Sequence, residues 1–184
     1  MEMTGEQMIA APRERVWAAL NDPEVLRRAL DGCEAFEKTS DGGFSARVVA
    51  KIGPVKAGFT GAVTLTDVDP PNGYMLEGEG TGAGAGFAKG RARVRLADVG
   101  GFTRLSYEVS AEVGGKLAQI GARLIDQTAR KLADGFFARF AAIVGEGGAA
   151  PSAPARPAGP SWPVAAILAL AALAIGFLAG RLWG

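Results

Sequence analysis

Residues 103–144, TRLSYEVSAEVGGKLAQIGARLIDQTARKLADGFFARFAAIV, decide the fold because their apolar period changes once, at Gly114-Gly115. Before the glycine pair, apolar and polar residues alternate, which predicts a β-strand with one buried face. After it, the period becomes three to four, which predicts one long amphipathic helix over 116–144. The stripe comprises Leu117, Ile120, Leu124, Thr128, Leu132, Phe136 and Phe140, and the polar face comprises Arg123, Asp126, Arg130, Lys131, Asp134 and Arg139.

The residues before this segment predict mostly strands. Residues 2–9 form a candidate first strand, and two short helices begin near Pro12 and Pro23. Alternating runs then start at Phe44, Phe59 and Tyr74, and the last of these is expected to dissolve into a glycine-rich stretch. Residues 91–96 alternate again before a Gly100-Gly101 turn. This order predicts an α+β fold of the helix-grip type, a curved antiparallel sheet around a long C-terminal helix.

A helix-grip fold often leaves a cavity between sheet and helix. Several small residues either make room there or allow the sheet to bend sharply, and the sequence leaves both interpretations open. These residues are Gly58, Gly61, Gly78, Gly80 and Gly121.

Composition removes several kinds of chemistry. The chain has no histidine and a single cysteine, Cys33, so histidine-based catalysis and cysteine-rich metal sites are excluded. We expect no catalytic residues, no metal and no covalent cofactor. The formal net charge of +1 argues against nucleic acid as a partner, and no polybasic run indicates a membrane surface.

Two charged stripes are predicted on neighbouring strands. Arg91, Arg93 and Arg95 share one face of their strand, and Glu108 and Glu112 share the outer face of the next. Cross-strand Arg–Glu pairs explain both stripes without a ligand. A docking surface for a protein partner is the alternative.

The C-terminal part of the sequence differs in character from the preceding domain, 1–144. Residues 145–161, rich in Gly, Ala, Pro and Ser, predict a disordered linker. Residues 162–183 are long and apolar enough for one transmembrane helix, with Trp162 and Trp183 expected at the two headgroup levels. Gly176 and Gly180 are spaced for close helix packing, so a homodimer through this helix competes with the ordinary abundance of glycine in such segments.

Orientation follows from the N-terminus rather than from flanking charge. Only Arg156 and Arg181 lie near the ends of the apolar segment, so the positive-inside rule is nearly silent. The first residues, MEMTGEQMIAAPRER, lack the apolar core of a signal peptide. We therefore expect a single-pass inner-membrane protein with its N-terminal domain in the cytoplasm.

Four local sequences together resemble the CoxG family of carbon monoxide dehydrogenase proteins. They are Gly32-Cys33-Glu34, KIGPVKAGFTGAVTLTDVDPP at 51–71, GFAKGRARVRL at 86–96 and TRLSYEVSAEVGGKLAQIGARLID at 103–126. The resemblance covers roughly residues 1–144, and Asp31 departs from the proline usual in the family. It implies an SRPBCC, or START-like, helix-grip fold with an apolar cavity, and a role beside a molybdenum-containing carbon monoxide dehydrogenase or related hydroxylase. Family members resemble recruiters of that soluble enzyme to the membrane.

A respiratory dehydrogenase passes electrons to a quinone in the bilayer, so the expected cavity ligand is a quinone, menaquinone or ubiquinone. The cavity candidates are Phe59, Val63, Leu76, Leu105, Tyr107, Ile120, Leu124 and Phe136, for each of which plain core packing is the alternative. A cyclase- or aromatase-like enzyme and a lipid-transfer module are the other functions this fold class would suit.

Overall fold

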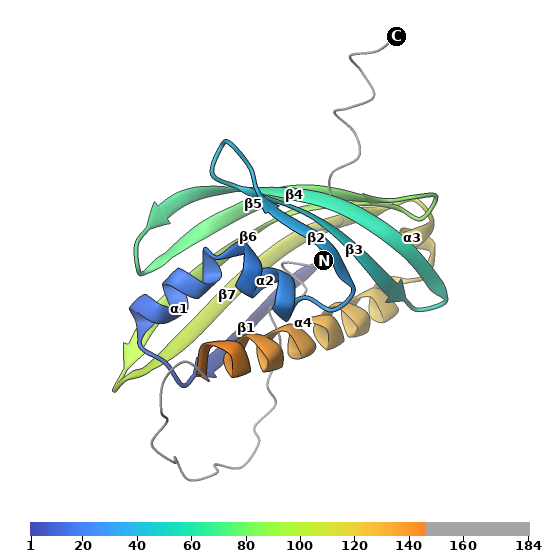
Figure 1. The fold of residues 1–184 in the computed structure, drawn as a ribbon. Helices are drawn as coiled ribbons and strands as arrows, with labels where there is room; N and C mark the ends of the chain where they lie inside the picture. The colour runs from blue at the N-terminus through green and yellow to red at the C-terminus, as the bar shows by residue number, and fades with distance from the viewer. Residues whose placement is uncertain (146–184) are drawn as a thin grey trace.

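The computed structural model describes residues 1–145, which form one antiparallel sheet and four helices (Figure 1). The strands are β1 (Glu2–Ile9), β2 (Cys33–Lys38), β3 (Phe44–Ile52), β4 (Val55–Asp69), β5 (Gly73–Gly82), β6 (Gly86–Val99) and β7 (Phe102–Gly114). The helices are α1 (Arg13–Leu20), α2 (Pro23–Ala29), α3 (Lys116–Gln119) and α4 (Ala122–Gly145). The sheet order is β1-β7-β6-β5-β4-β3-β2, so β1 joins the last strand while the other six follow the chain.

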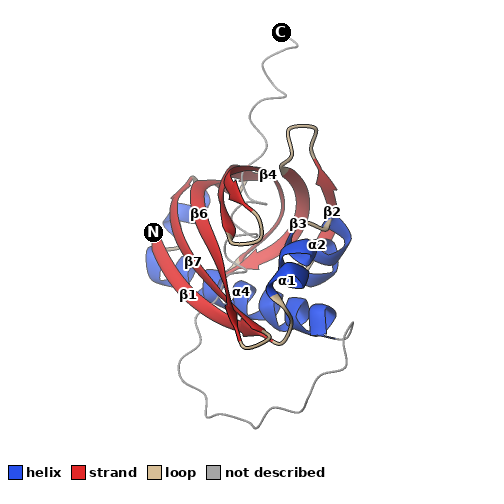
Figure 2. Cartoon of the chain, turned by 90° about the vertical axis from the view of Figure 1, so that its left-hand side faces the viewer, coloured by secondary structure: helices blue, strands red, loops and turns tan. Residues whose placement is uncertain are grey.

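The sheet curves around α4, and α1 and α2 close the open side (Figure 2). Helix α2 packs against both α4 and β2. The guanidinium Nε of Arg139 on α4 donates a hydrogen bond of 2.7 Å to the carbonyl oxygen of Ala29, at the end of α2. The arrangement is the α+β helix-grip architecture that the sequence predicts.

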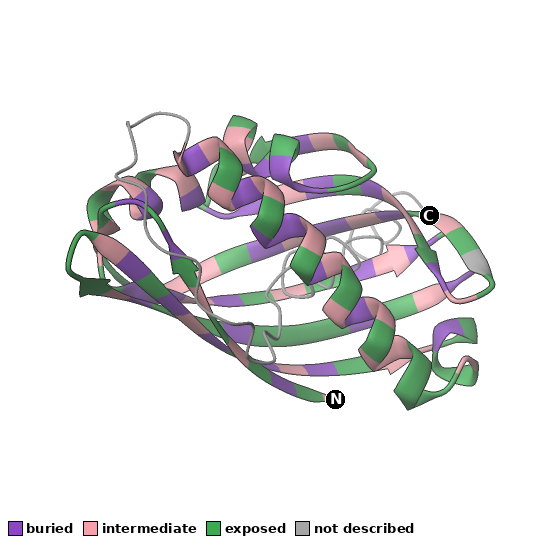
Figure 3. Ribbon diagram, turned by 90° about the horizontal axis from the view of Figure 1, so that it is seen from below, coloured by how far each residue is buried: buried purple, intermediate pink, exposed green. Residues whose placement is uncertain are grey.

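Burial follows the two periods expected from the sequence. Buried and exposed residues alternate along the strands, and a buried stripe runs along α4 (Figure 3). Phe136 and Phe140 on α4 are fully buried, and their rings stack with centroids 5.6 Å apart. Apolar side chains from the concave face of the sheet and from α4 therefore form the main core.

The predicted single helix over 116–144 is wrong in one respect. Gly121 has a φ of +93°, which interrupts the helix between α3 and α4. The break changes the register of the buried stripe, so α4 buries Ala129, Ala133, Phe136, Phe137, Phe140 and Val144. Leu124 and Thr128, predicted on the buried stripe, lie outside this buried set.

Two strand predictions also need correction. β2 was not predicted, because only Phe36 in this edge strand is buried and no alternation is visible. β5 does not dissolve at its glycines but continues to Gly82, pairing with β4 and β6. Glycine carries no side chain, so the apolar period that predicts a strand is lost there although the backbone still pairs.

The predictions for the C-terminal part lie outside the described residues, apart from Gly145, which ends α4. These are the linker over 145–161 and the transmembrane helix over 162–183, with Trp162, Gly176, Gly180 and Trp183. Among the helices of residues 1–145, none is long and apolar enough to cross a membrane.

Candidate functional site

The predicted cavity residues gather on the concave side of the sheet and on the helices that face it. Six of the eight are buried: Phe59, Val63, Leu76, Leu105, Tyr107 and Phe136. Ile120, at the end of α3, is half-buried. Leu124 is 38% exposed, because the break at Gly121 turns it away from the buried stripe of α4. Leu124 is thus a residue of the molecular surface rather than of the interior.

The buried residues fall into two separate apolar clusters. The main cluster contains five of the predicted residues: Val63, Leu76, Leu105, Tyr107 and Phe136. A smaller cluster beside α3 consists of Ile52, Phe59, Ala85, Ala88 and Leu117, with Ile120 packed against it. Glycines of the inner face separate the two, since Gly61 lies between Phe59 and Val63 on β4 and pairs with Gly80 on β5. Without side chains, these glycines cannot bridge the clusters.

Gly78 answers the question of room or bending at its own position. A Cβ atom there would lie 2.6 Å from both the carbonyl oxygen of Ala62 and Cγ1 of Val63. Real Cβ atoms do not approach other atoms so closely, so the absence of a side chain lets β4 and β5 come together. Gly78 therefore serves close strand packing rather than open space.

Tyr107 contributes a polar atom to the apolar interior. It projects from β7 toward α4, its ring lies 6.4 Å from that of Phe137 at an interplanar angle of 17°, and the residue is 2% exposed. Its hydroxyl is buried and has no hydrogen-bond partner in the described part of the chain. Burial raises the pKa of this hydroxyl, and the negative charge of Asp134 adds to the rise. Tyr107 is neutral at physiological pH and free to donate one hydrogen bond.

Asp126 is the site residue that sequence reasoning missed. The helical pattern placed it on the polar face of α4, yet its Oδ1 atom is buried and lacks a hydrogen-bond partner among residues 1–145. Asp126 is also only partly exposed as a residue. The sequence signal that could have found it was the position of Gly121, since restarting the helical count there moves Asp126 toward the buried side.

Together these groups suit binding more than covalent chemistry. An apolar enclosure with one hydroxyl donor and one carboxylate acceptor can hold an apolar molecule that has a polar head. Cys33 is half-buried, and its Sγ donates to the carbonyl oxygen of Ala35 at 3.3 Å. Burial raises the pKa of the Cys33 thiol, which disfavours the reactive thiolate. Within residues 1–145, no three His, Cys, Asp or Glu side chains are grouped to hold a metal ion.

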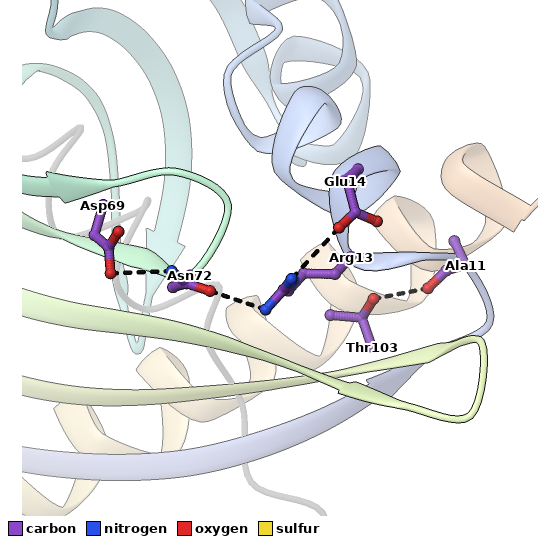
Figure 4. A network of polar contacts seen from close by, with 6 residues as sticks. All are labelled: Ala11, Arg13, Glu14, Asp69, Asn72 and Thr103. Atoms are coloured by element: carbon purple, nitrogen blue, oxygen red, sulfur yellow. Dashed lines mark hydrogen bonds and ion pairs between the residues drawn. The ribbon is translucent and has the colours of Figure 1, made fainter.

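A second concave region, a groove of about 640 Å³, lies on the outer face of β4–β7. A polar network borders it, in which Arg13 donates to Asn72 Oδ1 at 2.8 Å and Asn72 donates to Asp69 Oδ2 at 3.1 Å (Figure 4). The lining includes three arginines, Arg93, Arg95 and Arg104, and three carboxylates, Glu6, Asp67 and Asp69. Because these charges balance, the groove fits a mixed protein surface better than a small anion.

The arginine stripe of β6 lies on this outer face, as predicted. The register places Arg91 opposite Glu77 and Arg93 opposite Glu108, so opposite charges are neighbours. The ion pairs that form on these strands are instead Lys89–Glu112 at 2.9 Å and Arg104–Glu6 at 3.6 Å. In the described part of the chain, the three stripe arginines make no ion pair, so cross-strand pairing does not account for them.

Comparison with known proteins gives a family and a fold. A family model for CoxG, the G subunit of carbon monoxide dehydrogenase, matches residues 5–145. A conserved protein of Geobacillus kaustophilus is 30% identical with a TM-score of 0.75, and the match covers 79% of this chain and 96% of that one. No curated protein matches the chain.

Two more distant solved structures share the fold alone. A protein of Arthrobacter aurescens is 20% identical with a TM-score of 0.56, over 79% of this chain and 86% of its own. A protein of Rhizobium leguminosarum is 17% identical with a TM-score of 0.59, over 79% and 95%.

Proposed function

The chain belongs to the CoxG family of carbon monoxide dehydrogenase, and from this premise we propose that it is an accessory protein of a molybdenum-containing carbon monoxide dehydrogenase or a related hydroxylase. The match over residues 5–145 is the observation that carries the proposal. In this role the protein recruits the soluble enzyme to the inner membrane and performs no catalysis of its own. The chain has no histidine, and the interior offers hydrogen bonds and apolar surface rather than a nucleophile with a base.

The ligand we propose for the interior is a quinone, menaquinone or ubiquinone. Its isoprenoid tail matches the apolar side chains between sheet and α4, and its ring oxygens match the Tyr107 hydroxyl. A buried hydroxyl without a partner is unfavourable in the empty protein, so a ligand oxygen at this position gains a full hydrogen bond. The predicted apolar anchor over 162–183 would keep this interior near the membrane pool of quinone.

Recruitment of the enzyme is assigned to the outer face of β6. Arg93 and Arg95 line the outer groove and make no ion pair among residues 1–145, so their charge is available to a partner. Replacing both by glutamate should abolish co-purification of the enzyme while leaving quinone binding intact. Arg28→Glu is the matched control, since Arg28 is an exposed arginine on α2, away from this face.

One experiment tests the function as a whole. The tagged full chain is isolated from native membranes in mild detergent, and both the co-purifying proteins and the solvent-extracted small molecules are identified. A molybdenum hydroxylase together with a quinone supports the proposal. A phospholipid without any redox enzyme would instead favour a lipid-transfer module. Titration of the purified chain with quinone then gives the affinity, and no saturable binding would refute the quinone assignment.

A further inference from the structure

One end of the molecule concentrates positive charge that is scattered in the sequence. The β3–β4 hairpin, the β5–β6 hairpin and the β7–α3–α4 connection meet at this end, on the right of Figure 1, which we name the α3 end. Its segments, residues 50–58, 80–88 and 113–125, contain four basic residues and no acidic residue. The basic residues are Lys51, Lys56, Lys116 and Arg123, and all four are exposed.

Direct contacts join the three segments into one surface. The amide of Leu117 in α3 donates to the carbonyl oxygen of Ala85 in the β5–β6 turn at 2.9 Å. The β3–β4 turn lies against α4, where a Cβ atom on Gly53 would be 2.8 Å from Cδ2 of Leu124. The amide of Ala83 donates to the carbonyl oxygen of Gly58 at 3.3 Å. The four cations therefore belong to a single face.

Nothing in residues 1–145 neutralises these four cations. None of them takes part in an ion pair, and Lys51 and Lys56 are direct cross-strand partners, which places like charges opposite each other. Arg123 lies in the first turn of α4, where a cation opposes the helix dipole and no acidic residue compensates. The nearest strand carboxylate, Glu34, belongs to β2, whose first residue Cys33 pairs with Val48, before the turn.

Apolar side chains are exposed at the same end. Leu124 is 38% exposed and Phe87 is 45% exposed, beside the smaller apolar cluster that contains Phe59 and Leu117. A face that combines free cations with exposed apolar side chains fits the surface of an anionic bilayer, where the charges meet headgroups and the apolar groups enter the interface.

Charge distinguishes this end from the opposite one, which also exposes apolar residues. Met8, Val68 and Val99 are exposed there. However, the β4–β5 and β6–β7 turns, residues 66–74 and 97–103, carry three carboxylates and no cation. An anionic surface would repel these turns and attract the α3 end.

We propose that the α3 end docks onto the anionic surface of a lipid bilayer. The proposal rests on the proposed function only in taking the membrane as the nearby surface, which the predicted apolar anchor over 162–183 keeps within reach. Docking in this orientation turns the smaller apolar cluster and the adjoining interior toward the lipid, so an apolar ligand would pass between them without crossing water.

Lipid contact is measured on the full chain, reconstituted without quinone into vesicles that contain nitroxide-labelled lipid. A fluorophore is attached at Ala83→Cys in the β5–β6 turn or, as the matched control, at Val99→Cys in a turn of the opposite end. Both are built in a Cys33→Ala background, and both native residues are exposed. Quenching of the Ala83 label but not of the Val99 label is expected when the vesicles contain phosphatidylglycerol. The difference should vanish with phosphatidylcholine alone or in high salt.

The charge is then removed at the α3 end, by changing Lys51, Lys56, Lys116 and Arg123 to glutamine. Each exposed cation near an anionic surface contributes ~1 kcal/mol, which is about five-fold in binding, so losing all four should weaken docking on the order of several hundred-fold. The matched control changes two exposed cations elsewhere, Lys38 and Lys131, and should leave quenching unchanged.

Three results would overturn the proposal: equal or stronger quenching of the Val99 label, quenching that ignores lipid charge, or a glutamine variant that stays folded by circular dichroism yet docks normally. An unquenched Ala83 label would assign the α3 end to an acidic protein partner instead. Because the vesicles carry no quinone, the outcome is independent of whether the interior binds one.

Discussion

The Tyr107 hydroxyl provides the sharpest test of the interior site, because the same substitution should have opposite effects on the empty and the occupied protein. Tyr107→Phe removes one oxygen and leaves the ring that packs on Phe137. The hydroxyl is buried without a partner in the described residues, and such a group costs roughly 1–3 kcal/mol. We therefore expect Tyr107→Phe to raise the free energy of unfolding of the quinone-free protein by ~1–2 kcal/mol.

Urea unfolding of detergent-solubilised, quinone-free protein measures this change. With a slope of about 2 kcal/mol per molar, the midpoint should rise by roughly 0.5–1 M. Quinone affinity should move the other way, because the bound ligand loses one hydrogen bond worth about 0.5–1.5 kcal/mol, or roughly two- to ten-fold. Tyr74→Phe is the matched control, since the Tyr74 hydroxyl is not among the buried unpartnered atoms.

Two outcomes would refute the reasoning. If Tyr107→Phe lowers the stability of the quinone-free protein, the hydroxyl already has a partner that the substitution removes. If stability rises but quinone affinity is unchanged, the hydroxyl lies in the core without touching the ligand, and the polar end of the site is elsewhere.

Three further predictions concern the fold. Gly121→Ala should destabilise the protein by ~1–3 kcal/mol because its φ of +93° is strained for alanine, whereas Gly135→Ala inside α4 should stabilise it by ~0.5–1 kcal/mol; thermal melts compare the two, and equal shifts would contradict the assigned break. Arg139→Gln should cost about 1–3 kcal/mol through the lost hydrogen bond to the end of α2, and an unchanged melt would show that this contact does not hold α2 in place. Burial raises the pKa of both Tyr74 and Tyr107, so their contribution to stability is fully present below pH ~10 and is lost as pH rises further, at most ~1.4 kcal/mol per pH unit for each. Phenolate absorbance followed with pH checks this, and ionisation of either folded tyrosine near pH ~10 would contradict it.

Much of the fold was predictable because its elements are long and strongly periodic. The alternation of β7 and the stripe of α4 identify a strand followed by a helix, and the Gly100-Gly101 turn places β6 beside β7 with Val99 opposite Phe102. The edge strand β2 was not predictable in this way, since it buries only Phe36. The glycine-rich end of β5 was missed because a backbone can pair in a sheet without side chains that report it.

The candidate site divides along the same line. The apolar residues Val63, Leu76 and Leu105 could be assigned to the interior from alternation alone, and all three are buried. The polar atoms could not, because one left-handed glycine resets the helical register and carries Leu124 outward and Asp126 inward. A periodic count along the sequence assumes an unbroken helix, and a single backbone angle invalidates it.

The sequence by itself determined the helix-grip architecture, the family and the absence of histidine chemistry, because these depend on local period and composition. It also showed no polybasic run that would indicate a membrane surface. Only the tertiary structure decided that Lys51, Lys56, Lys116 and Arg123 share one face, since antiparallel strands return distant turns to the same end of the sheet. Electrostatic potential depends on distances in space rather than along the chain, so a nearly neutral sequence can fold into a molecule with one strongly positive end.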